Sequence, residues 1–196
     1  MKKILLFLMI TLRLYGTTYY IDATNGNDNY DGLTPETSWQ TISKLNTMYF
    51  NPGDEILFKR GEEWREQFNP TSSGSEKFPI IIGAYGSGNK PIFNGADQVT
   101  GFVEMENNIY NIESPRIDLG AIIVVIDGLE LKRVETISEL TNGTFYLDIN
   151  PSPDLLYIYS VSDPNKQKVE ISGMRVDGIQ LKAKSYITIE ELEFRY

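Results

Sequence analysis

Short apolar stretches, separated by glycine, proline, asparagine and aspartate, recur along most of the chain. Residues 19–22, 55–59, 79–85 and 90–95 are of this kind, and the isoleucine-rich stretches have no polar face. Runs of this length between turn-forming residues are typical of β-strands. Strands that are buried on one side by their neighbours in a stack have this pattern, so we expect these segments to stack in a β-sheet core.

A helical pattern occurs in one stretch, between the first two of these strands. Apolar residues recur there at helical spacing, at Trp39, Ile42, Leu45 and then Met48 or Tyr49. Thr37 and Ser38 are candidate N-caps, and Pro52-Gly53 ends the pattern. We therefore predict one short amphipathic helix, which follows a compact turn at 25–32.

Residues 99–172 have a different pattern, which indicates a small antiparallel insert. The apolar run 122–126 meets 129–134 across Asp127-Gly128, a two-residue link that favours a tight antiparallel hairpin. Two further strands are expected in this insert, at 144–148 and 155–161.

The last stretch of the chain returns to the first pattern. Ile187 and Ile189 alternate inward, and so do Leu192 and Phe194, but the step between the two pairs is three residues. Strict alternation cannot continue across that step, so we expect a bend at Glu190-Glu191. A strand, a corner and a second strand are typical of one coil of a β-solenoid.

Composition limits the chemistry that these elements can support. The chain has 196 residues, 41% of them hydrophobic and 23% charged, as expected for one globular domain with a small insert. Its net charge of -9 repels phosphate backbones, so nucleic acid is not expected as a partner. Cysteine and histidine are both absent, which excludes disulfides, thiolate metal sites and Ser-His-Asp hydrolysis.

Residues 1–16 have the layout of a secretory signal peptide. A basic start at Met1-Lys2-Lys3 is followed by an apolar run from Ile4 to Leu12 and by Gly16. The run is shorter than the roughly 20 residues that span a bilayer, and Arg13 follows it, so a membrane anchor is the weaker alternative. We expect a bacterial protein that is secreted or periplasmic and leaves the membrane once the signal is removed.

Several motifs follow one another in a characteristic order. They are Tyr19-Tyr20-Ile21-Asp22, Gly26-Asn27-Asp28, Asp31-Gly32, Trp39-Gln40-Thr41-Ile42, the run from Pro52 to Gly61, Gly83-Ala84-Tyr85-Gly86, Leu156-Tyr157-Ile158-Tyr159 and Tyr186-Ile187-Thr188-Ile189. Together they resemble the N-terminal part of bacterial secreted right-handed parallel β-helix proteins of the pectate-lyase-like superfold, including a small inserted β domain. One departure is Glu191, at a bend where the resemblance leads us to expect glycine.

The resemblance implies an all-β fold, a right-handed parallel β-helix truncated at its C-terminus. Its N-terminal cap, with one short helix, and its first coils would occupy 17–98, the inserted antiparallel domain 99–172, and an incomplete resumed coil 173–196. Such proteins include polysaccharide lyases and glycoside hydrolases, so we expect a fragment of a carbohydrate-active protein, inactive alone, with a polysaccharide as partner. The active site is expected beyond Tyr196. The alternative is a non-catalytic surface β-helix for adhesion or structure.

A calcium-binding loop is partly matched by Asn27 to Gly32, on the pattern D-x-[DN]-x-[DN]-G. The first position is Asn instead of Asp, and Ser38 stands where a bidentate Glu belongs, with Glu36 two residues early. We expect a hydrogen-bonded turn without a metal or cofactor, and calcium remains the alternative. Calcium-dependent glycan binding by the inserted domain is a third, weaker hypothesis.

No catalytic residue can be assigned from the sequence, although two sets of side chains are worth following. Glycoside hydrolysis needs two carboxyl groups across a cleft; the candidates are Glu62, Glu63, Glu66, Glu190, Glu191 and Glu193. Elimination from a uronate needs a base and a cation; the candidates are Lys182, Lys184 and Arg195. Their neighbours are typical of solvated strand faces, so surface positions are expected. Trp39 is expected in the core, whereas Trp64 fits either the core or a sugar-stacking surface.

Overall fold

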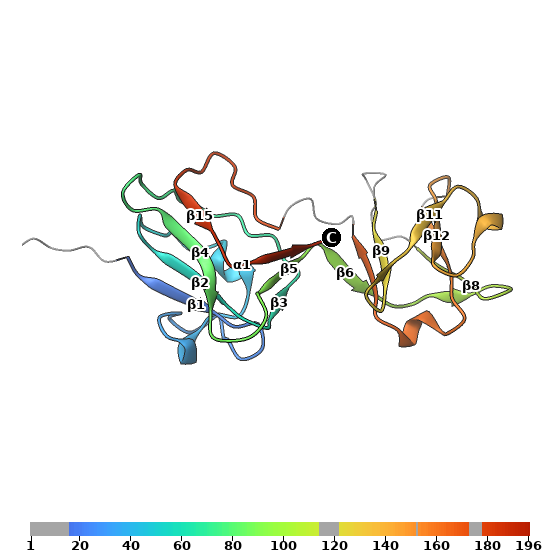
Figure 1. Ribbon diagram of the computed structural model, residues 1–196, viewed down its shortest axis with the longest axis horizontal. Coiled ribbons are helices and arrows are strands. Elements are labelled where there is room, and N and C mark those ends of the chain that lie inside the picture. The colour runs from blue at the N-terminus through green and yellow to red at the C-terminus, as the bar shows by residue number, and fades with distance from the viewer. Residues whose placement is uncertain (1–15, 114–121, 152, 173–177) are drawn as a thin grey trace, which may run out of the picture.

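The computed structural model describes residues 16–113, 122–151, 153–172 and 178–196. Strands provide most of its regular structure, and they form two units that lie side by side (Figure 1). Within these described residues the structure is nearly all β with one α-helix, in agreement with the prediction. The predicted signal peptide, apart from Gly16, lies outside the described residues.

The first unit contains two sheets in which every strand pair is parallel. One sheet has the order β1-β2-β4-β15, formed by β1 (Thr18–Ile21), β2 (Glu55–Lys59), β4 (Ile80–Tyr85) and β15 (Ile187–Ile189). The other has the order β16-β5-β3, formed by β3 (Glu63–Trp64), β5 (Ile92–Asn94) and β16 (Glu193–Arg195). The chain thus passes three times from a strand of one sheet to a strand of the other.

Parallel register places similar side chains above one another in this parallel unit. Trp64 pairs with Phe93, and Phe93 pairs with Phe194. Ile56 pairs with Ile82 in the other sheet, and both are completely buried. Such columns remove apolar surface from water and form one continuous core.

The N-terminal cap differs from the predicted helix. Helix α1 (Ile42–Leu45) is short, and its N-cap is Thr41, whose Oγ1 accepts a hydrogen bond from the Lys44 amide at 3.0 Å. Trp39 instead forms a parallel bridge with Ile21, and its amide donates to the Tyr20 carbonyl at 2.9 Å. The prediction that Trp39 belongs to a helix is wrong, because its backbone covers the free edge of β1. A 3-10 helix, η1 (Pro35–Thr37), precedes it.

The second unit contains one antiparallel and one mixed sheet, and we call it the antiparallel unit because every strand pair described in it, except one in the mixed sheet, is antiparallel. The first has the order β10-β9-β14-β6, formed by β6 (Ala96–Val99), β9 (Val124–Ile126), β10 (Leu129–Glu130) and β14 (Val169–Ser172). The second has the order β11-β12-β13-β8-β7, formed by β7 (Val103–Glu104), β8 (Ile109–Glu113), β11 (Lys132–Val134), β12 (Thr144–Asp148) and β13 (Leu155–Tyr159). Their inner faces share one apolar cluster. Two 3-10 helices, η2 (Ile137–Glu139) and η3 (Pro164–Lys166), lie in connections.

Two local predictions are confirmed, the first of them over a shorter pairing than expected. The hairpin across Asp127-Gly128 is present as β9 and β10, and positive φ angles of 49° and 83° at the two residues suit its tight turn. The pairing ends at Glu130, however, and β11 joins the other sheet. The bend at Glu190-Glu191 is also present, and Glu191 has a φ of 58°, a conformation that favours glycine.

The predicted division at 98/99 and 172/173 stays a prediction. Strand β6, which begins at Ala96, already pairs with β14 of the second unit. The change from parallel to antiparallel pairing therefore occurs between Asn94 and Ala96.

Candidate functional site

Charged side chains gather where the chain leaves the parallel unit and enters the antiparallel unit, and Gly95 is the crossing point. Its amide donates to the Arg195 carbonyl at 2.8 Å. A Cβ atom on Gly95 would lie 2.0 Å from the Tyr196 carbonyl oxygen, so a side chain here requires the backbone to move. Glycine is thus needed for β16 to lie against the crossing.

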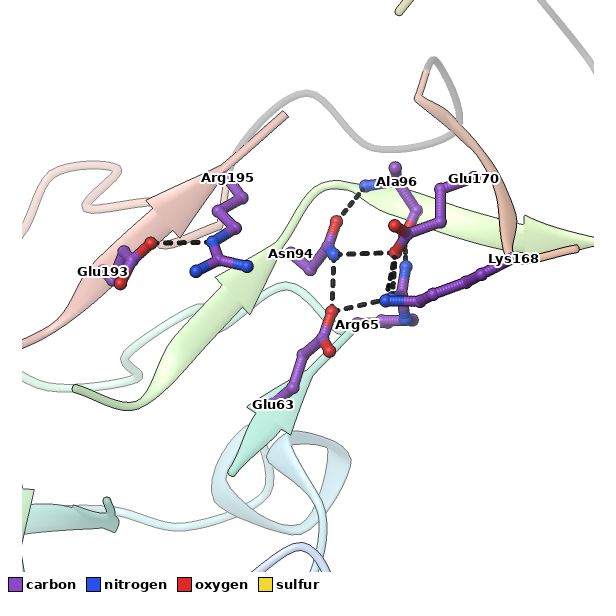
Figure 2. A network of polar contacts seen from close by, with 8 residues as sticks. All are labelled: Glu63, Arg65, Asn94, Ala96, Lys168, Glu170, Glu193 and Arg195. Atoms are coloured by element: carbon purple, nitrogen blue, oxygen red, sulfur yellow. Dashed lines mark hydrogen bonds and ion pairs between the residues drawn. The ribbon is translucent and has the colours of Figure 1, made fainter. Parts of the chain in front are cut away.

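A buried amide organises the polar groups around this crossing. The Asn94 Nδ2 donates to the carboxylates of Glu63 and Glu170, the latter at 3.2 Å, and its Oδ1 accepts from the Ala96 amide at 2.8 Å. Arg65, which follows β3, donates to both carboxylates and to the Ala96 carbonyl (Figure 2). One guanidinium therefore connects β3, β6 and β14.

Glu170 is the most enclosed acid of this network. Its side chain is 3% exposed, and the Lys168 Nζ lies 3.2 Å from its Oε1. Burial alone would raise the pKa of Glu170, but hydrogen bonds from Arg65 and Lys168 hold that pKa below its usual value. Glu170 is therefore ionised and neutralised at pH 7, which does not suit the role of a proton donor.

Two of the predicted acids and one predicted cation meet at this junction. Glu63 belongs to the network, and Glu193 and Arg195 lie beside it on the edge strand β16 (Figure 2). Arg195 Nε donates to Glu193 Oε1 at 2.7 Å, and this hydrogen bond is the main reason that the pKa of Arg195 is raised. Each carboxylate thus has a cationic partner. Such paired charges suit a structural role, in which they hold strands together, better than a role in proton transfer.

The remaining predicted acids have structural contacts elsewhere. Glu66 caps helix α1, because its carboxylate accepts from the Ser43 amide at 2.7 Å and from the Ile42 amide at 3.3 Å. Glu62 accepts from Thr24 Oγ1 at 2.7 Å. Glu191 pairs with Arg60 at 2.7 Å, and Glu190 is exposed at the same bend.

The cations proposed for elimination do not come together. Lys184 Nζ donates to the Thr71 carbonyl at 2.9 Å, whereas Arg195 contacts Glu193. Lys182 is exposed in the segment that precedes β15. The geometry therefore does not support these three side chains as one catalytic group.

In the calcium-like loop, the carboxylate oxygens of Asp28 accept hydrogen bonds from the protein itself. Asp28 Oδ1 accepts from the amides of Gln40 and Thr41, and its Oδ2 accepts from Thr41 Oγ1 at 2.6 Å. Burial raises the pKa of Asp28, but these donors lower it overall. Within the described residues, no three acidic, histidine or cysteine side chains form a group that could hold a metal. Calcium remains an untested alternative.

Both tryptophans belong to the core. Trp39 is 2% exposed and stacks on Tyr19 with ring centroids 5.1 Å apart, as predicted. Trp64 is 3% exposed and its Nε1 donates to the Gln40 carbonyl at 3.1 Å. Of the two positions predicted for Trp64, the structure shows the core position. Trp64 is therefore not a candidate for stacking on a sugar.

Sequence reasoning did not identify four residues of this network: Asn94, Arg65, Lys168 and Glu170. Val169 and Ile171 alternate with Glu170 in β14, a pattern that normally places the acid in solvent. β14 is instead a central strand, and Arg65 from the other unit covers the face that carries Glu170. The residues around Glu170 give no indication of its contact with Arg65, because the two are 105 positions apart in the sequence.

Across the described stretches of chain, no helix has the length and apolar character needed to cross a bilayer. No protein-family model matches the sequence.

Known proteins match parts of the chain. The sequence is 32% identical over 83 residues to a lacto-N-biosidase of Bifidobacterium longum subsp. longum, covering 39% of this chain and 5% of that protein. A structure of XylC in complex with xylose is similar with a TM-score of 0.71 and 20% identity, covering 90% of this chain and 35% of XylC. A GH136 lacto-N-biosidase from Eubacterium ramulus is 30% identical over 42% of this chain and 14% of its own, but its TM-score of 0.38 carries no structural argument. The likeness to XylC shows a shared fold, and the chain spans a small part of each matched protein.

Proposed function

We propose that these residues form the N-terminal cap and first coils of a right-handed parallel β-helix in a secreted, carbohydrate-active protein. The observation that carries the proposal is the column of Trp64, Phe93 and Phe194, one residue from each of three successive passages of the chain. Repeated strand, bend and strand with parallel register is the stacking principle of a β-solenoid. The antiparallel unit then interrupts the stack between its second and third passages.

The comparisons support a carbohydrate as the class of substrate. The relative with 32% identity is a lacto-N-biosidase, and the structure with the same fold was solved with xylose. We favour glycoside hydrolysis over elimination, because the sequence match is to a biosidase and the candidate cations for elimination are dispersed.

The described residues have a structural role in this proposal. Trp39 covers one edge of the stack, and the network around Asn94 holds the antiparallel unit in place. The carboxylates of Glu63 and Glu170 are balanced by two cations, Arg65 and Lys168, so neither carboxylate is poised to react. The reacting groups of the whole protein lie outside these residues.

The proposal is tested by the genomic DNA on the 3′ side of the Tyr196 codon. Translated in all frames, it should encode further coils with paired acids or a cluster of basic residues. The protein encoded with those coils should then release reducing sugar from neutral glycans, and the 196-residue chain alone should not. An unrelated gene immediately downstream, or coils whose product releases no reducing sugar from neutral glycans such as xylan, would contradict the enzymatic proposal and favour the adhesive or structural alternative.

A further inference from the structure

The outer face of the five-stranded sheet carries a row of side chains that differs from its buried face. Paired residues across β11, β12, β13, β8 and β7 are Val134, Tyr146, Tyr157, Asn111 and Val103. Their strand neighbours Phe145, Leu156 and Ile158 point the other way, into the core. The row therefore faces away from the core.

Two tyrosines form the centre of this row. The rings of Tyr146 and Tyr157 are stacked, with centroids 5.8 Å apart and an interplanar angle of 25°. Both side chains are half-buried, and no further ring contact to either is found among the described residues. Each ring thus keeps one face that the other ring does not cover.

A hollow of about 410 Å³ adjoins the row, between the β7–β8 hairpin and η2. Its walls are Met105, Glu106, Asn107, Ile109, Ile137 and Ser138. Asn111 Nδ2 lies 3.5 Å from Met105 Sδ, which connects the hollow to the tyrosine row. Asn107 and Asn108 have φ angles of 57° and 63°, so a tight turn fixes the hairpin tip.

This combination of groups matches the two chemical faces of a sugar. A pyranose ring has apolar C–H faces that pack on flat aromatic rings, and hydroxyl groups around its rim that bond to amides and phenols. The hollow and row contain the Asn111 amide and two phenols, without a basic side chain. Three acids lie in the hollow or on the same face of the sheet, namely Glu106, Glu113 and Asp148, against one basic residue, Lys132. The excess of negative charge disfavours acidic sugars.

We propose that this face of the antiparallel unit binds a neutral oligosaccharide, with Tyr157 as its central contact and the hollow at Ile137 as an adjoining subsite. Such binding goes beyond the proposed function, because it needs no bond cleavage and uses none of the residues at the junction. In a larger protein it would hold a glycan chain near the stack.

Isothermal titration of the 196-residue protein with xylohexaose and cellohexaose tests this site. We expect the unsubstituted protein to bind at least one neutral probe. In Tyr157→Ala the affinity for that probe should fall by about tenfold or more. Tyr157→Phe, which keeps the ring, should retain most of the affinity. Tyr49→Ala is the matched control, because Tyr49 is 69% exposed in the parallel unit and should be silent.

Three results would overturn the site. They are no binding of either neutral probe to the unsubstituted protein, equal affinities for Tyr157→Ala and Tyr49→Ala, and tighter binding of an oligogalacturonate than of both neutral probes. Unchanged thermal unfolding of Tyr157→Ala excludes misfolding as the cause of lost affinity. Failure here leaves the proposed function standing, since the downstream DNA tests that proposal separately.

Discussion

The two units of this protein bury their apolar side chains in different ways. In the parallel unit, contacts repeat from one strand to the next, as between Phe93 and Phe194, whose ring centroids are 5.4 Å apart. In the antiparallel unit, two sheets face each other over a shared core that includes Phe145 and Leu156. The first arrangement can be extended by adding strands, whereas the second encloses its own core.

The two ends of the parallel unit also differ in how their edge strands are covered. Trp39 covers β1 at one end of the parallel unit, but in the described residues no strand pairs with the outer edges of β15 and β16. Phe194 is accordingly 51% exposed at the end of its column. Stability in the parallel unit should therefore depend on neighbouring strands, and the small junction at Asn94 should determine how strongly the two units are coupled.

The largest expected effect is on stability, and it tests whether the two cores unfold separately. Phe58→Ala removes a completely buried ring that contacts Trp64 and Phe93, and should cost about 3–5 kcal/mol of unfolding free energy. Both tryptophans lie in the parallel unit, so tryptophan fluorescence during urea unfolding reports this unit. Leu156→Ala, in the other core, is the matched control and should shift the circular dichroism transition more than the fluorescence transition. Equal shifts in both signals for both variants would show one cooperative core.

A second variant tests the coupling at the junction. Arg65→Met leaves the buried Glu170 with Lys168 as its remaining cation. The variant should destabilise the protein by about 3 kcal/mol, the lower end of the range for breaking a buried pair, because one of two cationic partners is lost. Arg195→Met, which breaks an exposed pair, should change stability by less than about 1 kcal/mol. Urea unfolding followed by both signals measures the two effects. If Arg65→Met is as mild as Arg195→Met, the network does not hold the units together.

The elements that sequence reasoning predicted well depend on local chemistry. The hairpin at Asp127-Gly128 follows from two turn-forming residues between apolar runs, and β2 occupies the predicted 55–59. The bend at Glu190-Glu191 follows from one three-residue step in an alternating pattern. Neighbouring residues are sufficient to specify such features.

The features that sequence reasoning missed depend on distant segments. Trp39 has helical spacing with Ile42 and Leu45, yet the free edge of β1 offers its backbone better hydrogen bonds. Glu170 looks like a solvated strand residue until Arg65, in another unit, covers it. The junction network could be found only once the fold brought β3, β5 and β14 together, so no candidate site could be predicted there.

A smaller effect concerns pH. The folded pKa of Glu170 lies below its ordinary value of 4.5, so its ion pairs stabilise the folded state above that pH. This contribution should be lost as the pH falls through 4.5 towards the lower folded pKa. Glu170→Gln should lower stability at pH 7 and flatten the acid side of the stability curve, measured by urea unfolding from pH 7 to pH 3. Glu113→Gln, at an exposed position, is the control and should leave the curve unchanged.

The smallest effect concerns the corner that joins β15 to β16. Glu191 adopts a φ of 58°, which is unfavourable for a residue with a side chain, and its carboxylate forms an exposed ion pair with Arg60. Glu191→Gly removes the backbone strain together with the weak ion pairs to Arg60 and Lys90, so the thermal midpoint should rise slightly.

Glu190→Gly is the matched control for this corner, because Glu190 lacks a positive φ and glycine there only adds freedom to the unfolded chain. Its thermal midpoint should fall. A fall of similar size in both variants would mean that the ion pairs of Glu191 outweigh its backbone strain. Opposite shifts would show that the corner needs a left-handed residue, as the parallel stack requires wherever a short bend carries the chain from one sheet to the next.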